Sequence, residues 1–160
     1  REIGLNWAKA DSRFDLSKEV NEPNKVGYVV EIDPLNPNST PKKHTALGRF
    51  KHENAELVIS KDGKIVVYMG DDERGEYLYK YVSNESINEV KDKSTLLSNG
   101  NLYVAKFNDN FTGEWLLLDT QTTGFSSKAE VCIFTRLAAS KVGATTMDRP
   151  EWIASNPKKK

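Results

Sequence analysis

The most regular alternation of apolar and polar positions lies in the middle of the chain. Two apolar runs rich in β-branched residues, Glu56–Ser60 and Lys64–Met69, are separated by a turn that contains Asp62 and Gly63. Asp-Gly supplies the positive backbone angle that a tight β-hairpin needs, so the pattern predicts two antiparallel strands. Tyrosines then alternate with other residues from 77 to 82, which predicts a third strand. Three consecutive antiparallel strands form a meander, the unit of a β-propeller blade.

Shorter patterns predict further strands on both sides of this meander. Apolar residues alternate over residues 26–32, and residues 35–43, which contain prolines, are expected to form a connecting loop. Leu102–Phe107 and Glu114–Leu118 repeat the strand, turn and strand pattern. Together these runs predict a mainly β fold built from antiparallel strands.

One segment near the end of the chain has the pattern of a helix. Ser127 and Glu130 match a capping box, and the apolar positions that follow predict one helix to about Lys141, ended by Gly143. A propeller blade takes about 40 to 50 residues and a closed propeller needs about four blades. The predicted fold is therefore a partial propeller of antiparallel blades with one C-terminal helix.

The composition argues against two classes of binding partner, membranes and nucleic acids. The chain has 160 residues, of which 38% are hydrophobic, and its 23 Lys and Arg residues balance 23 Asp and Glu residues. No apolar run is long enough for a membrane span, and a balanced charge gives no field for nucleic acid, so we expect neither partner. Cys132 lies between Val131 and Ile133, which predicts a buried structural thiol.

Charged residues gather where the predicted strands begin and end. Lys51–Glu53 precedes the hairpin, and Asp71–Arg74 fills the gap after it. Clustered carboxylates in loops are typical ligands of hard cations. Arg149 and Glu151 flank Pro150, which restricts the backbone, so that these alternate side chains are expected to project to the same side. Solvated strand-end carboxylates and an exposed ion pair are the structural alternatives.

Three strings in these regions carry a resemblance to a known family. They are Thr45–Glu53, Met69–Arg74 with its continuation to Tyr77–Lys80, and Met147–Trp152. In order and spacing, the chain resembles the PhoX-type alkaline phosphatases, which are calcium- and iron-dependent exported enzymes built on a β-propeller. The resemblance implies that residues 1–160 form a single domain, the C-terminal fragment of a larger β-propeller phosphatase.

The resemblance also implies roles for four residues. Glu53 would be a ligand of iron and calcium, Asp72 a ligand of calcium and Glu151 a ligand of iron, so the implied cofactors are Ca²⁺ and Fe³⁺. Arg149 would bind the phosphate group of the substrate and is the expected catalytic residue. Carboxylates accept calcium, magnesium, manganese and ferric iron alike, so the residues alone leave the metals open.

Two neighbours of these residues are candidates for a supporting role. His52 could contact the ligands or act as a general acid, and its structural alternative is a satisfied histidine of the scaffold. Asp71 could be a second carboxylate beside calcium, and its alternative is an aspartate of a tight turn.

The expected function is phosphomonoester hydrolysis, with this chain carrying part of the active site. The family also uses metal ligands from other parts of the protein, including a cysteine on iron, so we expect the isolated chain to be inactive. Its expected partners are a phosphomonoester substrate and the remaining segment of the same protein, in the periplasm or outside the cell. A non-catalytic calcium-binding propeller module and a propeller lactonase are the alternative functions.

Overall fold

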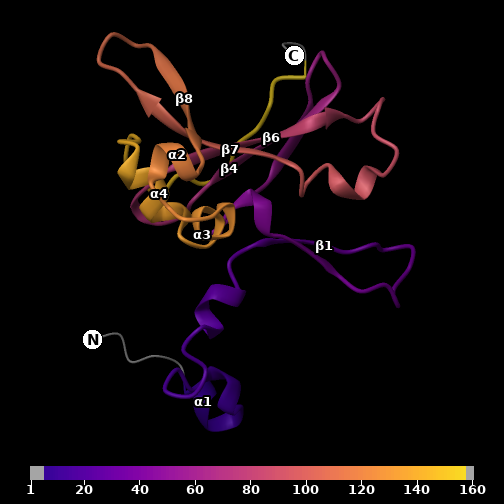
Figure 1. Cartoon of the computed structure of the whole chain (residues 1–160), viewed down its shortest axis with the longest axis vertical. Helices are drawn as coiled ribbons and strands as arrows, with labels where there is room; N and C mark the ends of the chain where they lie inside the picture. Colours follow the sequence, from indigo (N-terminus) through magenta and orange to yellow (C-terminus); the bar gives the residue numbers. More distant parts are fainter. Residues whose placement is uncertain (1–5, 158–160) are drawn as a thin grey trace.

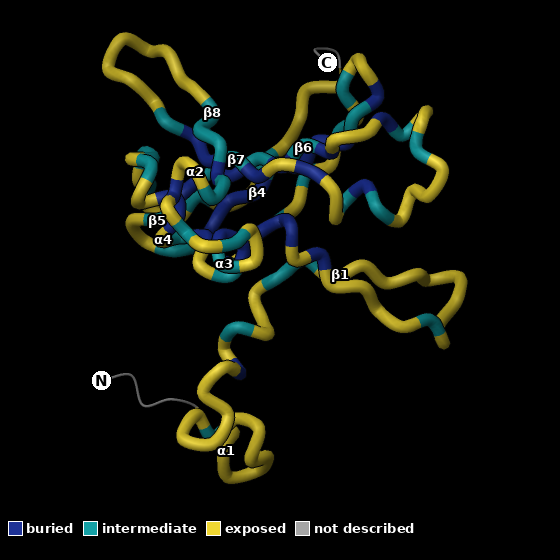
Figure 2. Tube along the Cα trace, in the orientation of Figure 1, coloured by how far each residue is buried: buried dark blue, intermediate teal, exposed yellow. Residues whose placement is uncertain are grey.

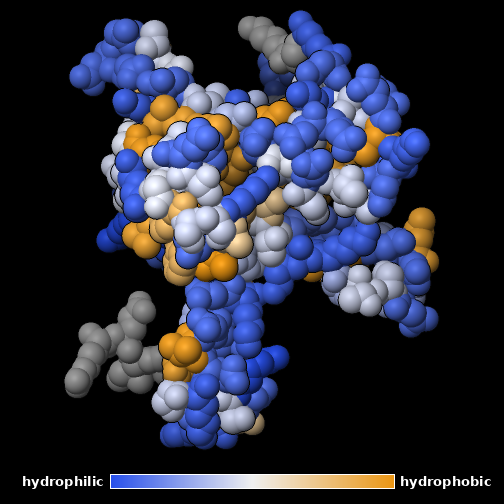
Figure 3. All heavy atoms as spheres, viewed as in Figure 1, coloured by the Kyte–Doolittle hydropathy of each residue, from blue (hydrophilic) through white to orange (hydrophobic). Residues whose placement is uncertain are grey.

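The computed structural model describes residues 6–157, which form a body of strands and helices and an N-terminal arm that extends away from it (Figure 1). The arm is exposed over most of its length, whereas the buried residues concentrate in the body (Figure 2). The visible surface of the arm is mainly hydrophilic, with few apolar residues (Figure 3). The arm contains α1 (Trp7–Ala10) and the 3₁₀ helices η1 (Ser12–Phe14) and η2 (Glu22–Lys25).

The body is built around one five-stranded antiparallel sheet whose strand order is β3-β4-β6-β7-β8. The predicted hairpin and the predicted strand pair after it are confirmed, and they join in this one sheet. The short 3₁₀ helix η4 (Lys93–Thr95) lies between β6 and β7. The strands are β3 (Glu56–Ile59), β4 (Lys64–Gly70), β6 (Leu78–Ser86), β7 (Gly100–Phe107) and β8 (Gly113–Leu118). Mainly antiparallel β structure is therefore confirmed, while residues 6–157 form no closed propeller.

Two short ribbons lie outside this sheet. One joins β1 (Val29–Glu31) to β2 (Lys42–His44), and the other joins β5 (Arg74–Glu76) to β9 (Met147–Asp148). The strand predicted over residues 26–32 is only three residues long. Val26, Val30 and Ile32 stay exposed because the ribbon projects from the body and no second layer covers it in the described part of the chain, whereas Val29 packs against the core (Figure 2).

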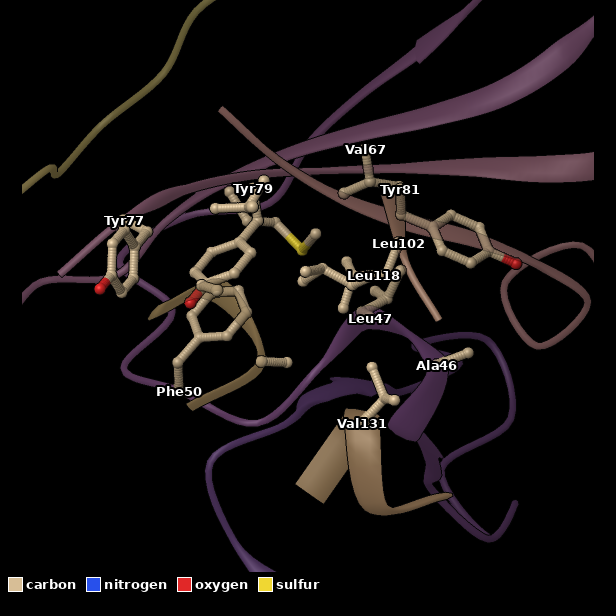
Figure 4. Packing of buried hydrophobic residues seen from close by; sticks show 14 of the residues in the cluster. Ala46, Leu47, Phe50, Val67, Tyr77, Tyr79, Tyr81, Leu102, Leu118 and Val131 are labelled. Atoms are coloured by element: carbon tan, nitrogen blue, oxygen red, sulfur yellow. The ribbon is translucent and has the colours of Figure 1, made fainter. Parts of the chain in front are cut away.

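The hydrophobic core lies between one face of the sheet and the helices. Val67, Tyr81, Leu102 and Leu118 are paired in register across four strands, and all four are buried. Figure 4 shows Leu102 and Leu118 on the face of the sheet that is turned toward Val131 of the helical layer. Buried positions alternate over the first part of β6, as the period-two pattern predicts, whereas three consecutive residues of β4, Ile65–Val67, are all buried. The helical layer contains the 3₁₀ helix η3 (Thr45–Leu47) and the helices α2 (Thr120–Thr123), α3 (Lys128–Ile133) and α4 (Thr135–Lys141).

The prediction of a single helix from Ser127 to Lys141 is wrong, because the helix is interrupted at Phe134. The carbonyl of Cys132 accepts hydrogen bonds from the backbone N–H of Arg49, at 2.9 Å, and from the hydroxyl of Thr135, at 2.8 Å. These donors take the place of the helical N–H four residues further on, so α3 ends and α4 starts anew.

The predicted capping box is only half formed. The hydroxyl of Ser127 accepts from the N–H of Glu130, at 3.2 Å, but the carboxylate of Glu130 turns back to the N–H and hydroxyl of Ser126. Cys132 is a buried free thiol, as predicted, and burial raises its pKa. Among residues 6–157, no helix is long and apolar enough to cross a membrane.

Candidate functional site

The structure brings the three sequence strings together beside one end of the sheet. The ribbon of β5 and β9 pairs Arg74 with Asp148, and the N–H of Arg149 donates to the carbonyl of Glu73, at 3.3 Å. On the other side of the same loop, the N–H of Asp72 donates to the carbonyl of Lys51, at 3.0 Å. Segments about 20 and 77 residues apart in sequence thus meet around residues 71–74.

Gly70 allows the third segment to lie against the sheet. A Cβ atom at this position would be 2.3 Å from the carbonyl oxygen of Pro150 and 2.6 Å from that of Glu151. Both distances are far below van der Waals contact and both atoms belong to the backbone, so only glycine fits without displacement. The absence of a side chain at Gly70 therefore helps to place Arg149 and Glu151.

Asn54 holds the continuation of this segment. Its amide Nδ2 donates to the carbonyl of Ile153, at 2.8 Å, and its Oδ1 accepts from the N–H of Ile153, at 3.2 Å. The side chain thus takes the place of a strand partner for one residue. Sequence reasoning missed Asn54, although an amide directly after Glu53 is a residue type that satisfies backbone groups in irregular segments.

Arg149 forms what we call the outer pair with Asp72. Its Nε and Nη2 donate to the two carboxylate oxygens of Asp72, each at 2.8 Å, and Nη2 lies 3.3 Å from Oε1 of Glu151. Hydrogen bonding to Asp72 and the charge of Glu151 raise the pKa of Arg149. The side chain is 50% exposed, and Nη1 makes no hydrogen bond with residues 6–157. Two of the predicted metal ligands and the predicted phosphate ligand therefore meet.

Asp71 and Arg136 form a second fork, the inner pair, directly beside the first. Nε and Nη2 of Arg136 donate to the two oxygens of Asp71, each at 2.7 Å, and the N–H of Lys51 donates to Oδ1, at 3.1 Å. Asp71 is fully buried, and its oxygens are occupied. Arg136 was missed by sequence reasoning, although it is the only charged residue between Phe134 and Ser140.

Comparison with known proteins decides the family. A family model described as alkaline phosphatase PhoX matches residues 2–160. The chain belongs to the PhoX family. A comparison with curated protein sequences gives no significant match.

A solved PhoX structure has the same fold over almost the whole chain. It is PhoX of Pseudomonas fluorescens in complex with vanadate, a transition state analogue, with 52% sequence identity and a TM-score of 0.88. The match covers 96% of this chain and 29% of the Pseudomonas chain. The chain therefore spans less than a third of the length of that PhoX protein.

His52 packs inward, away from the carboxylates assigned by the PhoX resemblance. Its Nε2 lies 3.0 Å from the carbonyl oxygen of Gly48, so Nε2 carries the proton and donates it. The ring stacks on Phe50 at a centroid distance of 3.8 Å, and buried Nδ1 has no partner among the residues described. Burial lowers the pKa of His52, which favours the neutral ring. The side chain makes no hydrogen bond with Glu53, Asp72 or Glu151, so this geometry matches the alternative of a scaffold histidine.

The carboxylates do not form a metal centre by themselves. Glu53 is exposed, and its carboxylate has no hydrogen bond or ion pair within residues 6–157, while Asp72 is occupied by Arg149. In the same part of the chain, no three His, Cys, Asp or Glu side chains are placed to hold a metal ion. A metal site built on these carboxylates would need ligands in addition to them.

Proposed function

We propose that this chain is part of a phosphomonoesterase of the PhoX type and that Arg149 binds the phosphate group of the substrate. The observation that carries the proposal is the junction of Arg149, Asp72 and Glu151, contributed by segments about 77 residues apart, in a chain of the PhoX family. The vanadate complex of the Pseudomonas relative supports a phosphate-type substrate, because vanadate in that structure is named a transition state analogue.

The orientation of Arg149 suits this role. Asp72 fixes the guanidinium plane with two hydrogen bonds, while Nη1 has no hydrogen bond within residues 6–157 and the side chain is 50% exposed. A planar guanidinium matches phosphate oxygens well, and a donor that is already oriented stabilises developing negative charge without reorganisation. Asp72 would thus position the arginine before the substrate arrives.

We further propose that Glu53, Asp72 and Glu151 contribute carboxylates to a metal centre that other residues of a longer protein complete. Calcium and iron are the ions that the family resemblance implies. Such ions would supply charge neutralisation on the phosphate oxygens and an activated oxygen nucleophile. Because the family resemblance implies further metal ligands from other parts of the protein, we expect the 160-residue chain alone to lack phosphatase activity.

The longer protein would also complete the fold. We propose that the five-stranded sheet is part of a β-propeller, that this chain is its C-terminal part, and that the enzyme is periplasmic or secreted. The coverage of only 29% of the Pseudomonas chain supports the existence of a longer protein.

The test is hydrolysis of p-nitrophenyl phosphate by the longer protein, with calcium added, for the wild type and two arginine variants. Arg149→Ala should lower kcat/KM about 100-fold or more, the loss typical of one oriented donor to the transition state. Arg74→Ala is the matched control, because Arg74 lies in β5, which pairs with β9 next to Arg149, but its side chain is 83% exposed and forms only a 4.0 Å ion pair with Asp148. Unchanged hydrolysis in Arg149→Ala would refute the phosphate-binding role of Arg149, whereas no hydrolysis by the wild-type longer protein would favour a non-catalytic calcium-binding module.

A further inference from the structure

Arg136 is joined through Asp71 to two of the three segments of the candidate site. The two oxygens of Asp71 accept from Arg136, in α4, and Oδ1 also accepts from the N–H of Lys51. The N–H of Asp71 donates to the carbonyl of Tyr77, at 3.2 Å, directly before β6. One buried carboxylate thus links α4, the strand-end segment that carries Glu53 and the loop that carries Asp72.

The bonds around Asp71 fix the direction of its neighbour. Lys51 and the two aspartates form a reciprocal contact, because the N–H of Lys51 donates to Asp71 while the N–H of Asp72 donates to the carbonyl of Lys51. Adjacent side chains on an extended segment point to opposite sides. With Asp71 held inward, Asp72 points outward, where it meets Arg149.

Helix α4 is anchored well enough to act as a fixed support. Thr135 accepts from the N–H of Arg49, at 3.0 Å, and the hydroxyl of Ser140 lies 2.8 Å from that of Tyr77. Thr135 and the neighbouring Ala138 and Ala139 are fully buried. The guanidinium of Arg136 therefore projects from a helix held at both ends.

We propose that Arg136 is a positioning residue for the candidate phosphate site: by pairing with Asp71, it holds the loop in the geometry that directs Asp72 toward Arg149. This inference rests on the proposed function. Without Arg136, Asp71 would be a buried carboxylate that lacks its cation, and the loop would have to move to hydrate it. That movement would shift Asp72 and therefore the plane of the Arg149 guanidinium.

The positive charge of Arg136 also offsets negative charge near the outer pair. Nε of Arg136 lies 3.7 Å from Glu76, so its positive charge faces two carboxylates beneath the site. If Arg136 were removed, both negative charges would remain close to an anionic substrate. Phosphate affinity should then fall together with the orientation of Arg149.

The experiment compares Arg136→Gln and Arg136→Lys with the wild type in the longer, metal-loaded protein. Arg136→Gln should lower kcat/KM for p-nitrophenyl phosphate about 100-fold, as expected when a catalytic group is displaced by about 1 Å, and should weaken inhibition by vanadate by a similar factor. Arg136→Lys keeps the charge but not the fork, so it should restore only part of both losses. Folding of each variant is followed by its thermal unfolding midpoint.

Tyr81→Phe is the control for a purely structural effect. It removes a buried hydrogen bond of 2.8 Å to the carbonyl of Leu96, within the same core but between other segments. It should lower the unfolding midpoint and leave vanadate inhibition unchanged.

The outcomes separate the two proposals. Wild-type kcat/KM and vanadate inhibition in folded Arg136→Gln would overturn the positioning role, and so would an equal loss in Tyr81→Phe. If Arg136→Gln does not fold, Arg136→Lys decides: full activity and inhibition would overturn the role. Activity that survives Arg149→Ala would refute the proposed function itself, whatever the Arg136 variants do.

Discussion

The inner and outer pairs place two aspartate–arginine forks on adjacent residues in different surroundings. Their hydrogen bonds differ by only 0.1 Å, at 2.7 Å for Asp71 with Arg136 and 2.8 Å for Asp72 with Arg149. The side chain of Asp71 is 0% exposed, whereas that of Asp72 is 20% exposed and that of Arg149 50%. A buried charge has no water to replace a lost partner, so the inner pair stabilises the fold. The outer pair has the same geometry but leaves the guanidinium of Arg149 partly exposed and available to a ligand.

The largest expected effect on stability comes from breaking the inner pair. Arg136→Ala leaves Asp71 buried without its cation, and we expect the free energy of unfolding to fall by about 3 kcal/mol, the lower end for buried pairs because Arg136 is itself partly exposed. Urea unfolding of the longer protein measures this change. Adding Asp71→Asn should recover part of the loss, since a neutral amide costs less to bury. If the free energy of unfolding falls by no more than it does when an exposed ion pair is broken, the inner and outer pairs do not differ in their contribution to stability.

A substitution at Gly70 should disturb the outer pair and spare the inner one. In Gly70→Ala, the new methyl group would displace the backbone of Pro150 and Glu151, at an expected cost of about 1 to 3 kcal/mol for overpacking. Because Arg149 precedes this backbone, kcat/KM for p-nitrophenyl phosphate should fall as well. Gly143→Ala is the control: no atom lies within 4 Å of its added Cβ, and its positive φ, of 74°, adds a backbone strain that Gly70 does not have. Equal loss of activity in both variants would contradict the role of close approach.

His52, which packs inward beside Asp71, should make the stability of the folded state depend on pH. Burial lowers the pKa of His52 in the folded state, so the unfolded chain binds a proton first as the pH falls. Stability should therefore be unaffected by His52 above pH 7 and should decrease below about pH 6.5, by at most about 1.4 kcal/mol per pH unit. His52→Gln, which keeps a donor for the carbonyl of Gly48, should flatten the decrease between pH 7 and pH 5. Parallel stability curves for the two proteins would exclude this contribution.

Breaking the outer pair should have the smallest effect on stability. Arg149→Ala removes a half-exposed guanidinium from a carboxylate that water can reach, so the urea midpoint should barely change while phosphatase activity is lost. A large shift of the midpoint would show that the outer pair is structural too. Arg149→Ala and Arg136→Ala would then differ only in how much stability each of them loses.

The sequence predicted those parts of the fold and site that depend on neighbours in the chain. Asp62 and Gly63 indicated the hairpin, and the alternating tyrosines indicated the strand beside it, because turn chemistry and the period-two pattern are local. The three strings led to Arg149, Asp72 and Glu151, which do meet, although their roles stay predictions. Glu53 stays a prediction as well.

The features that sequence reasoning missed depend on distant partners. The helix break at Phe134 is caused by Arg49, 85 residues earlier in the sequence, and Arg136 finds its partner Asp71 in a loop between strands. The run over residues 26–32 predicted a longer strand than the structure contains, and its alternation does not reveal whether a second layer covers the strand. The pattern predicts which face is apolar, and only the tertiary structure decides what that face meets.

The arrangement of contacts also sets an expected order of folding. The five strands of the sheet are joined to their neighbours in chain order, apart from the short β5, so that hydrogen bonding can spread from the hairpin. The contacts that place the final segment, such as Asn54 with Ile153, close loops of about 99 residues. Since long loops are slower to close, the sheet should form early and the Arg149 segment should dock last. A chain leaving the ribosome would then hold a native-like sheet before it has a phosphate-binding arginine.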